Sequence, residues 1–378
     1  MANAQPQHQR QKQQHLFGSI SRSVNTHVHL NHVYLFLLFV IGFSLGVVIT
    51  LFLKNFLFTM AIAPFASTNT ASVSLEAQRF IKCNTSDDEL FRKATSMVQS
   101  KNIVVAKVAF MFLTKGPLPL APLWEKFFAG HEGFYSIYVH SHPFYNETVP
   151  ESSVFHGRRI PSQPVYWGTT TMIDAEKRLL ANALLDISNQ RFVLLSESCI
   201  PLFNFTTIYK YLINSNLSFL GSFDDPRSPG RGRYNPKMSP SINITDWRKG
   251  SQWFEVHRDL AVHIVSDTKY YRIFKTHCLP PCYSDEHYIP TLVNILYPEL
   301  NSNRSITWVD WSRGGPHPAK FGGNQITDEF LNQIRCRSKC LYNGNTVTSV
   351  CNLFARKFLP NALGPLLRIC PLLLGFNP

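Results

Sequence analysis

Continuous apolar runs alternate with amphipathic segments along the chain from about residue 100 onward. Four apolar runs have the length of a buried strand: 102–114, 134–142, 191–200 and 218–225. Three segments between them carry apolar residues at helical spacing: 121–130, 172–186 and 204–214. Strands that alternate with helices in this way predict an α/β fold with a parallel or mixed sheet and helices on both of its faces.

Two further helices are expected after the last of these strands, at 251–267 and 284–296. Ser284 is placed to cap the second helix at its N-terminus. Asp285 and Glu286 then fall in the first turn, where carboxylates suit the helix dipole. By itself, this acidic pair is explained by the electrostatics of the helix.

The candidate binding loops follow from the strand order. In open α/β sheets, ligands bind at the carboxyl ends of the strands, so the loops after Val139, Leu195 and Phe223 are the places to search. The loop after Phe223 is long and basic, "DDPRSPGRGRYNPKMSP" (224–240). Its composition is that of a solvated surface loop, but its position after a strand end favours contact with a substrate.

An uncharged apolar run of 21 residues, from Val33 to Leu53, lies near the N-terminus. As a helix it would be about 30 Å long, which matches the hydrocarbon core of a bilayer. Arg10, Lys12 and Arg22 precede the run, and no acidic residue does. This charge distribution predicts that the N-terminal side stays in the cytosol while the rest of the chain crosses the membrane.

This run divides the chain into four predicted parts: a Gln/His-rich disordered tail at 1–32, a signal anchor at 33–53, a stem at 54–98 and a lumenal domain at 99–378. A cleaved signal peptide is the alternative, because Ala61-Ile62-Ala63 is similar to a cleavage site. The apolar run is longer than the roughly 7–15 residues of a signal peptide, which favours an uncleaved anchor. Either alternative places the rest of the chain in a lumen or outside the cell.

The cysteines, the sequons and the charge agree with a lumenal compartment. All eight cysteines follow the apolar run, and in an oxidising lumen they are expected first as disulfide partners. The predicted N-glycosylation sites are Asn84, Asn146, Asn204, Asn216, Asn243 and Asn303. The formal net charge of +13 is spread along the chain without a Lys/Arg run. Phosphorylated small molecules or acidic glycans therefore explain it better than nucleic acid.

The stretch "CLPPCYSDEHYIPTL", which begins at Cys278, could build either of two sites. The residues for a zinc site would be His277, Cys278, Cys282 and His287. The adjacent His277 and Cys278 converge poorly on one ion, and the spacing fits no closed zinc motif. In a lumen, two cysteines this close favour a disulfide, to each other or to another cysteine. Asp285 or Glu286 then remains for acid/base chemistry.

Several common catalytic motifs are missing from the sequence: GxSxG, HExxH, the P-loop and GxGxxG. The Asp-x-Asp motif, with which many lumenal sugar-nucleotide transferases hold a divalent metal, is also missing. Asp224 and Asp225 are adjacent, so on a strand their carboxylates would point to opposite faces. Asp174 and Glu176 lie within a predicted helix. A transferase with this sequence is therefore expected to neutralise a leaving diphosphate with basic side chains, without a metal or another cofactor.

Five segments form an ordered set: "FVLLSESCIPL" (192–202), "GSFDDP" (221–226), "CYSDEHYIPTL" (282–292), "TWVDWSRGGPHPAKF" (307–321) and "FARKF" (354–358). Together they resemble the core-2/I-branching β-1,6-N-acetylglucosaminyltransferase family, in its plant-type branch. The resemblance covers roughly residues 100–375, and the tail, anchor and stem are similar to the family's architecture in the Golgi. It implies a GT-A-like, Rossmann-type fold, UDP-GlcNAc as the typical donor, inversion at the anomeric carbon and no metal requirement.

The resemblance also implies roles for individual residues. Glu286 of "SDEH" falls on the family's catalytic base. Lys357 of "FARKF", together with either Arg335 or Arg337 before Cys340, falls on the basic residues that bind the diphosphate. The candidate acceptor contacts are Arg231, Arg233, Tyr234, Trp308 and Trp311.

The sequence therefore predicts a single-pass type II glycosyltransferase of the Golgi membrane that moves a sugar onto a hydroxyl of a glycan or glycoprotein in a β-linkage. Animal members carry an acidic residue after the second strand, where this chain has His140-Ser141-His142, so the exact donor stays open. The acceptor and the linkage position stay open as well. A non-catalytic lumenal glycan-binding protein on the same fold and a zinc-dependent hydrolase at 277–287 are the alternatives.

Overall fold

The computed structural model describes residues 36, 38–46, 87–97, 105–336 and 338–376. The chain divides into two compact units, Met1–Gln78 and Arg79–Pro378. Of the predicted anchor, the helical residues 36 and 38–46 are described, and the rest lies outside the described residues, as does the predicted tail. No helix within the described ranges is both long enough and apolar enough to cross a membrane.

The centre of the second unit is a four-stranded mixed sheet with the strand order β2-β1-β3-β5. Its strands are β1 (Lys107–Leu113), β2 (Tyr135–His140), β3 (Asn189–Ser196) and β5 (Glu255–His257). The first three are parallel, and β5 runs antiparallel to β3. The parallel strands come from the predicted apolar runs, so the mixed α/β sheet with flanking helices is confirmed.

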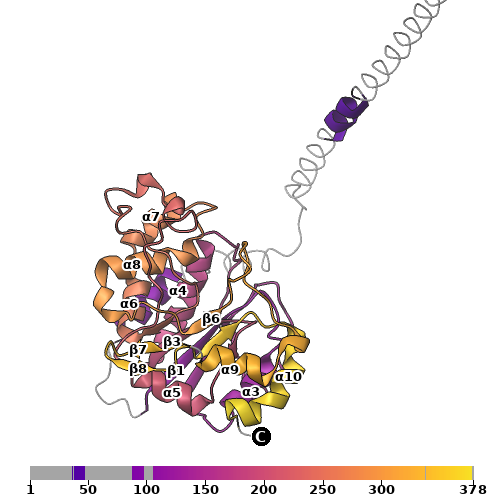
Figure 1. The fold of residues 1–378 in the computed structure, drawn as a ribbon. Helices are drawn as coiled ribbons and strands as arrows, with labels where there is room; N and C mark the ends of the chain where they lie inside the picture. The colour runs from indigo at the N-terminus through magenta and orange to yellow at the C-terminus, as the bar shows by residue number, and fades with distance from the viewer. Residues whose placement is uncertain (1–35, 37, 47–86, 98–104, 337, 377–378) are drawn as a thin grey trace, which may run out of the picture. The chain divides into compact units, whose positions relative to one another are not determined.

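Helices cover both faces of this sheet (Figure 1). One face packs against α3 (Ala121–Phe128), α5 (Phe205–Ile213) and α10 (Leu363–Ile369). The other face packs against α4 (Thr171–Leu184), α6 (Arg258–Ser266) and α8 (Tyr288–Leu296). Successive side chains of a strand point to opposite faces, and so Phe110 of β1 lies in the first core while Met111 lies in the second. Burial on both faces explains why β1 is a continuous apolar run.

The remaining elements extend this centre. A three-stranded sheet has the order β4-β9-β6, with β4 (Ile200–Pro201), β9 (Phe354–Arg356) and β6 (Thr307–Val309). A hairpin is formed by β7 (Cys340–Tyr342) and β8 (Thr346–Thr348), and two further α-helices are α7 (Lys269–His277) and α9 (Asp328–Cys336). Residues 87–96 of the predicted stem are helical, and Asp87 forms an ion pair with Arg178 of α4 (2.9 Å).

Two predicted elements differ from the structure. Residues 218–225 form isolated bridges, including those from Phe219 to Glu255 and from Phe223 to Lys249, instead of a regular strand. The predicted helix 251–267 is wrong over its first part, because residues 251–254 are irregular, β5 occupies the next three residues and α6 begins only at Arg258. The cause is Glu255, which is fully buried and pairs with Arg191 of β3 at 2.7 Å, so it does not mark a solvent-facing side of a helix.

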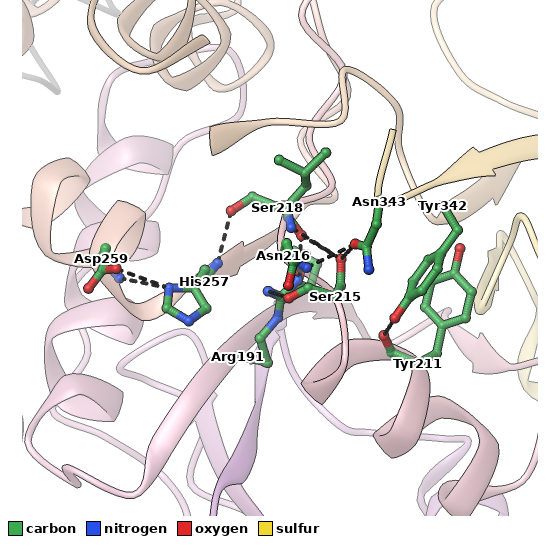
Figure 2. Close-up of polar contacts among 11 residues, drawn as sticks. Arg191, Tyr211, Ser215, Asn216, Ser218, His257, Asp259, Tyr342 and Asn343 are labelled. Carbon is green, nitrogen blue, oxygen red and sulfur yellow. Dashed lines mark hydrogen bonds and ion pairs between the residues drawn. The ribbon is translucent and has the colours of Figure 1, made fainter. Parts of the chain in front are cut away.

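Figure 2 shows the polar contacts around Arg191 at the amino end of β3. Arg191 donates to the carbonyl of Ser215 (3.2 Å), in the loop after α5. The side-chain oxygen of Asn343, in the turn between β7 and β8, accepts from Ser215 Oγ (3.1 Å) and from the backbone N–H of Asn216 (2.9 Å). These contacts fix the hairpin to the edge of the sheet that is opposite to the carboxyl ends of β1, β2 and β3.

The cysteines pair in part. Two disulfides are formed, Cys278–Cys282 and Cys340–Cys351. The cysteines that are free among the described residues are Cys199, Cys336 and Cys370. The expectation that every cysteine is a disulfide partner therefore does not hold for these three within the described part of the chain, and Cys83 lies outside it.

Candidate active site

The turn that carries Glu286 lies at the carboxyl end of the central sheet. Phe223 and Lys249 exchange two backbone hydrogen bonds of 2.8 Å at the end of the segment that follows α5. The next residue, Gly250, donates its backbone N–H to the carbonyl of Glu286 (2.8 Å). A Cβ at Gly250 would lie 2.1 Å from the carbonyl oxygen of Gly221, so only glycine permits this close approach.

The sequence predicts an α-helix that begins around Glu286, but the structure has none there. Ser284–Glu286 form a 3-10 turn, and α8 starts at Tyr288. Tyr283 precedes the turn with φ 55°, in the left-handed region, and Ser284 Oγ caps no backbone group. Ser284 Oγ is buried without a hydrogen-bond partner in the described structure, so the predicted N-cap is wrong.

Two cations hold the carboxylate of Glu286. Arg233 Nη1 lies 2.5 Å from Oε2, and Lys249 Nζ lies 2.8 Å from the same oxygen. All three side chains are about three-quarters buried, with 21–24% of each exposed. Within the described part of the chain, no hydrogen bond reaches Oε1 of Glu286. One oxygen is thus fixed by charge, and the other is left to accept a proton.

Burial alone would raise the pKa of Glu286, but the charges of Lys249 and Arg233 outweigh burial and hold that pKa below its usual value. Glu286 is therefore ionised at neutral pH. A carboxylate in this state can act as a general base, whereas a protonated one cannot.

Two further carboxyl groups lie behind Glu286. Burial raises the pKa of Asp285 to about 6, and the charge of Glu286 adds to this effect. Burial also raises the pKa of Glu176 well above its usual value, with a further contribution from Asp285. Glu176 Oε1 accepts from Gln252 Nε2 (2.9 Å), while Glu176 Oε2 and Asp285 Oδ1 are buried without partners among the described residues. At neutral pH, Asp285 and Glu176 together therefore carry less negative charge than two ionised carboxylates would.

A group of basic side chains surrounds Lys357 beyond the end of β3. The carbonyl of Lys357 accepts from the backbone N–H of Phe321 (2.9 Å), and the N–H of Phe358 donates to the carbonyl of Ser198 (2.9 Å). Burial lowers the pKa of Lys357, and the neighbouring charge of Arg356 lowers it further. Glu197 opposes this effect and Lys320 adds to it. A lysine whose pKa is lowered by neighbouring cations favours a bound anion.

Residues 249–253 connect these basic side chains to the carboxylates. Lys249 contacts Glu286, and Gln252 contacts Glu176. Trp253 lies under the guanidinium of Arg356, with 4.0 Å between Arg356 Cζ and the ring centroid. One short segment that leads into β5 therefore carries contacts to both halves of the site.

The other predicted diphosphate ligands are less well placed by the described contacts. Arg335, on α9, lies over the ring of Phe203 at 4.6 Å, and its Nε is buried without a partner among the described residues. No described contact joins Arg335 to Lys357. Arg337 lies outside the described residues, so the choice between Arg335 and Arg337 stays open.

The predicted acceptor residues take different positions. Arg233 contacts Glu286, whereas Arg231 forms an exposed ion pair with Asp224 (2.7 Å). Tyr234 donates its hydroxyl to the carbonyl of Ile242 (2.8 Å). Trp308 packs in part against the core around Phe321, and Trp311 is 49% exposed. The structure thus brings one of the five, Arg233, into contact with the predicted base.

The zinc alternative is wrong. The sulfur atoms of Cys278 and Cys282 are bonded to each other. His287 Nδ1 lies 2.8 Å from the carbonyl of Arg248, and the ring of His287 stacks on Trp247 at 4.5 Å. Burial lowers the pKa of His287 to about 4, so it is a neutral side chain that supports the turn.

The adjacent aspartates Asp224 and Asp225 are both engaged by arginines. Arg231 pairs with Asp224, and Arg227 pairs with Asp225 at 2.8 Å. His140 is the first residue of His140-Ser141-His142, the stretch that stands where animal members carry an acidic residue; it is buried, and burial lowers its pKa to about 4. Neither position presents a free carboxylate to a nucleotide.

The predicted sequons differ in exposure. Those with an exposed asparagine are Asn146, Asn216, Asn243 and Asn303. Asn204 instead caps α5, accepting from the backbone N–H of Thr207 (2.9 Å). Asn84 lies outside the described residues. All six stay predictions.

Sequence reasoning missed several residues that border Glu286 and Lys357, namely Glu176, Lys249, Gln252, Lys320 and Arg356. No local motif marks them, because each gains its neighbours through the fold. Arg356, which directly precedes Lys357 within "FARKF", is the one that the sequence could have indicated.

Comparison with known proteins identifies the family of the chain. The family model described as "Core-2/I-Branching enzyme" matches residues 108–335. Glycosyltransferase BC10 of Oryza sativa subsp. japonica is 36% identical over 298 residues, which cover 67% of this chain and 74% of that protein. The family match contains β1 from Val108 onward, the basic loop and Glu286, and it ends before Lys357. The chain belongs to the core-2/I-branching enzyme family and is a glycosyltransferase.

Proposed function

We propose that this glycosyltransferase moves a sugar, with UDP-GlcNAc as the first donor to test, onto a hydroxyl group of a glycan with inversion at the anomeric carbon. The observation that carries the proposal is that residues 249–253 join an ionised carboxylate, Glu286, to the basic side chains around Lys357. An inverting transfer needs one group of each kind, on opposite sides of the anomeric carbon.

Glu286 is the proposed base. As the acceptor oxygen bonds to the anomeric carbon, its proton passes to Oε1 of Glu286, the oxygen that no described residue contacts. The bond between the anomeric carbon and the diphosphate oxygen breaks, and UDP leaves with the bonding electrons. Proton transfer to a positioned carboxylate contributes roughly 10²–10⁴ in rate.

The basic side chains around Lys357 are proposed to meet the leaving diphosphate. Negative charge grows on UDP as the bond breaks, and preorganised cations stabilise that charge most where water is excluded. Arg356 and Lys320 each lie within electrostatic reach of Lys357. Arg335 or Arg337 would complete this set. With these cations the transfer is proposed to proceed without a divalent metal.

The proposed location is the Golgi lumen, with residues 33–53 as a type II anchor. It rests on the uncharged apolar run, on the basic residues ahead of it and on the disulfides Cys278–Cys282 and Cys340–Cys351, which are typical of an oxidising compartment. Protease protection in sealed microsomes tests it, because a type II topology shields the C-terminal domain and leaves the tail accessible.

The decisive experiment measures transfer from UDP-GlcNAc to a panel of glycans by the full chain, with and without EDTA, for wild type and Glu286→Gln. We expect wild-type transfer to survive EDTA. Glu286→Gln should lower kcat by about 10²–10⁴ while the Kd for UDP stays within twofold. Glu151→Gln, in an exposed turn, is the matched control. Equal kcat in Glu286→Gln and wild type would remove Glu286 from the mechanism.

A further inference from the structure

Exposed aromatic side chains gather next to the predicted base. Trp167 is 58% exposed, and its ring lies 4.8 Å from the ring of Tyr283 with an interplanar angle of 56°. The ring of the exposed His317 also lies close to Trp167, with 5.5 Å between the ring centroids. These three rings, which we call the aromatic wall, come from the segment before α4, the turn before Glu286 and the loop after β6. A large exposed tryptophan that is held by two other rings points to a binding surface.

The backbone holds Tyr283 in this position at a cost. Its φ of 55° is unusual for a residue with a bulky side chain. Gly168 has φ +79°, and a Cβ there would lie 3.3 Å from the Tyr283 ring. Backbone strain of this kind persists where the surrounding structure over-determines it, and it is concentrated at functional sites.

Arg233 joins the aromatic wall to the base. Its Cζ lies 4.4 Å from the centre of the Tyr283 ring, and its Nη1 lies 2.5 Å from Glu286 Oε2. The ring and the carboxylate are therefore separated by one planar guanidinium. A molecule that rests on Tyr283 and Trp167 lies beside the carboxylate that takes the proton.

We propose that Trp167 and Tyr283 form a subsite on which a pyranose ring of the acceptor glycan stacks while one of its hydroxyl groups faces Glu286. This subsite rests on the proposed function and names the acceptor's chemical class, a pyranoside with a C–H face free for stacking. A pyranose ring has such an apolar face and hydroxyl groups at its rim. Flat aromatic rings can cover the apolar face of the pyranose, and Arg233 can donate hydrogen bonds to its hydroxyl groups.

The position of the aromatic wall favours the acceptor over the uracil of the donor. Trp167 and Tyr283 are connected through Arg233 to the base, which must touch the acceptor hydroxyl. The cations proposed for the diphosphate gather instead around Lys357, on the other side of residues 249–253. A uracil on the aromatic wall would place the diphosphate beside Glu286, where the nearby cations Arg233 and Lys249 are already paired with the carboxylate.

The test compares Trp167→Ala with the matched Trp167→Phe, which keeps a ring, and with Leu372→Ala, which removes an apolar side chain that is 94% exposed elsewhere. The acceptors are methyl glycosides of β-galactose, α-N-acetylgalactosamine and β-xylose, which carry no aromatic group of their own. The acceptor KM at saturating UDP-GlcNAc, the Kd for UDP and the rate of UDP-GlcNAc hydrolysis without acceptor are measured for each variant. Saturation-transfer NMR reports glycoside binding independently of activity.

We expect Trp167→Ala to raise the acceptor KM about 3- to 10-fold, the range of one aromatic contact. The Kd for UDP and the hydrolysis rate should not change, and Trp167→Phe should restore most of the affinity. The subsite would be overturned by any of three results. Trp167→Ala leaves the acceptor KM unchanged, or it weakens UDP binding as much as acceptor binding, or the wild-type protein binds none of the glycosides. Absent turnover of every UDP-sugar tested by wild type, with NMR binding that Trp167→Ala abolishes, would refute the proposed function and leave the subsite standing.

Discussion

Asp285 offers a prediction that is independent of any substrate. Its side chain is 8% exposed, and its Oδ1 has no partner among the described residues. Burial raises its pKa from 3.8 to about 6 in the folded protein. Between about pH 4 and pH 6 the folded chain keeps a proton that the unfolded chain has lost, so the free energy of unfolding falls as the pH rises through this window. At 1.36 kcal/mol for each pKa unit, the loss is of the order of 3 kcal/mol.

Asp285→Asn removes this titration but keeps the shape of the side chain. We expect the variant to melt close to wild type at pH 4 and roughly 5 °C above it at pH 7.5, because 1 kcal/mol shifts the Tm by about 2 °C in a chain of this size. Differential scanning fluorimetry of the full chain across pH 4–8 measures both curves. Glu151→Gln, exposed at the surface, is the control and should follow wild type throughout.

The reasoning would be refuted by Tm curves of Asp285→Asn and wild type that stay parallel from pH 4 to pH 7.5. That result would mean that Asp285 ionises in the folded state as easily as in water. A variant that is less stable than wild type at every pH would mean that hydrogen bonding by the carboxylate outweighs the cost of burying its charge.

Three further results are expected. Lys249→Met should move the acid limb of the kcat/KM profile to higher pH, because it removes a cation that lowers the pKa of Glu286; an unmoved limb would contradict this role. Arg191→Met should lower the free energy of unfolding by about 3–5 kcal/mol in urea titrations, since it leaves Glu255 buried without its partner. Adding Glu255→Met should recover much of that loss, and additive losses would argue against the pair. Lys357→Gln should weaken UDP binding about tenfold or more by calorimetry, and an unchanged Kd would exclude Lys357 from the diphosphate site.

The sequence predicts the elements whose burial follows from their own residues. β1 and α4 lie within two to five residues of their predicted bounds, because a continuous apolar run and a helical stripe each carry a local signal. The segment 251–257 carries a misleading signal, since the polar Glu255 is neutralised by Arg191, 64 residues away in the chain. The apolar and polar pattern of residues 251–257 cannot show that Arg191 is the partner of Glu255.

The site follows the same division. The turn around Glu286 and the segment around Lys357 were identified through the family resemblance, each from its own short motif. Lys249, Gln252 and Trp167 were not, because their meaning depends on which side chains the fold brings to them. Residues that act through contacts between distant segments are found from the structure, because no sequence motif contains both partners.

The short segment 249–253 has a consequence for engineering. It is anchored by backbone hydrogen bonds to Phe223 on one side and to Glu286 on the other, and it does not belong to the basic loop 224–240. A chimera that exchanges residues 226–240 with another family member but keeps Arg233, which contacts Glu286, changes the surface offered to the incoming glycan and keeps the contacts of the base. Loop exchange that retains Arg233 and residues 249–253 is therefore a route to new acceptor preferences with the transfer chemistry preserved.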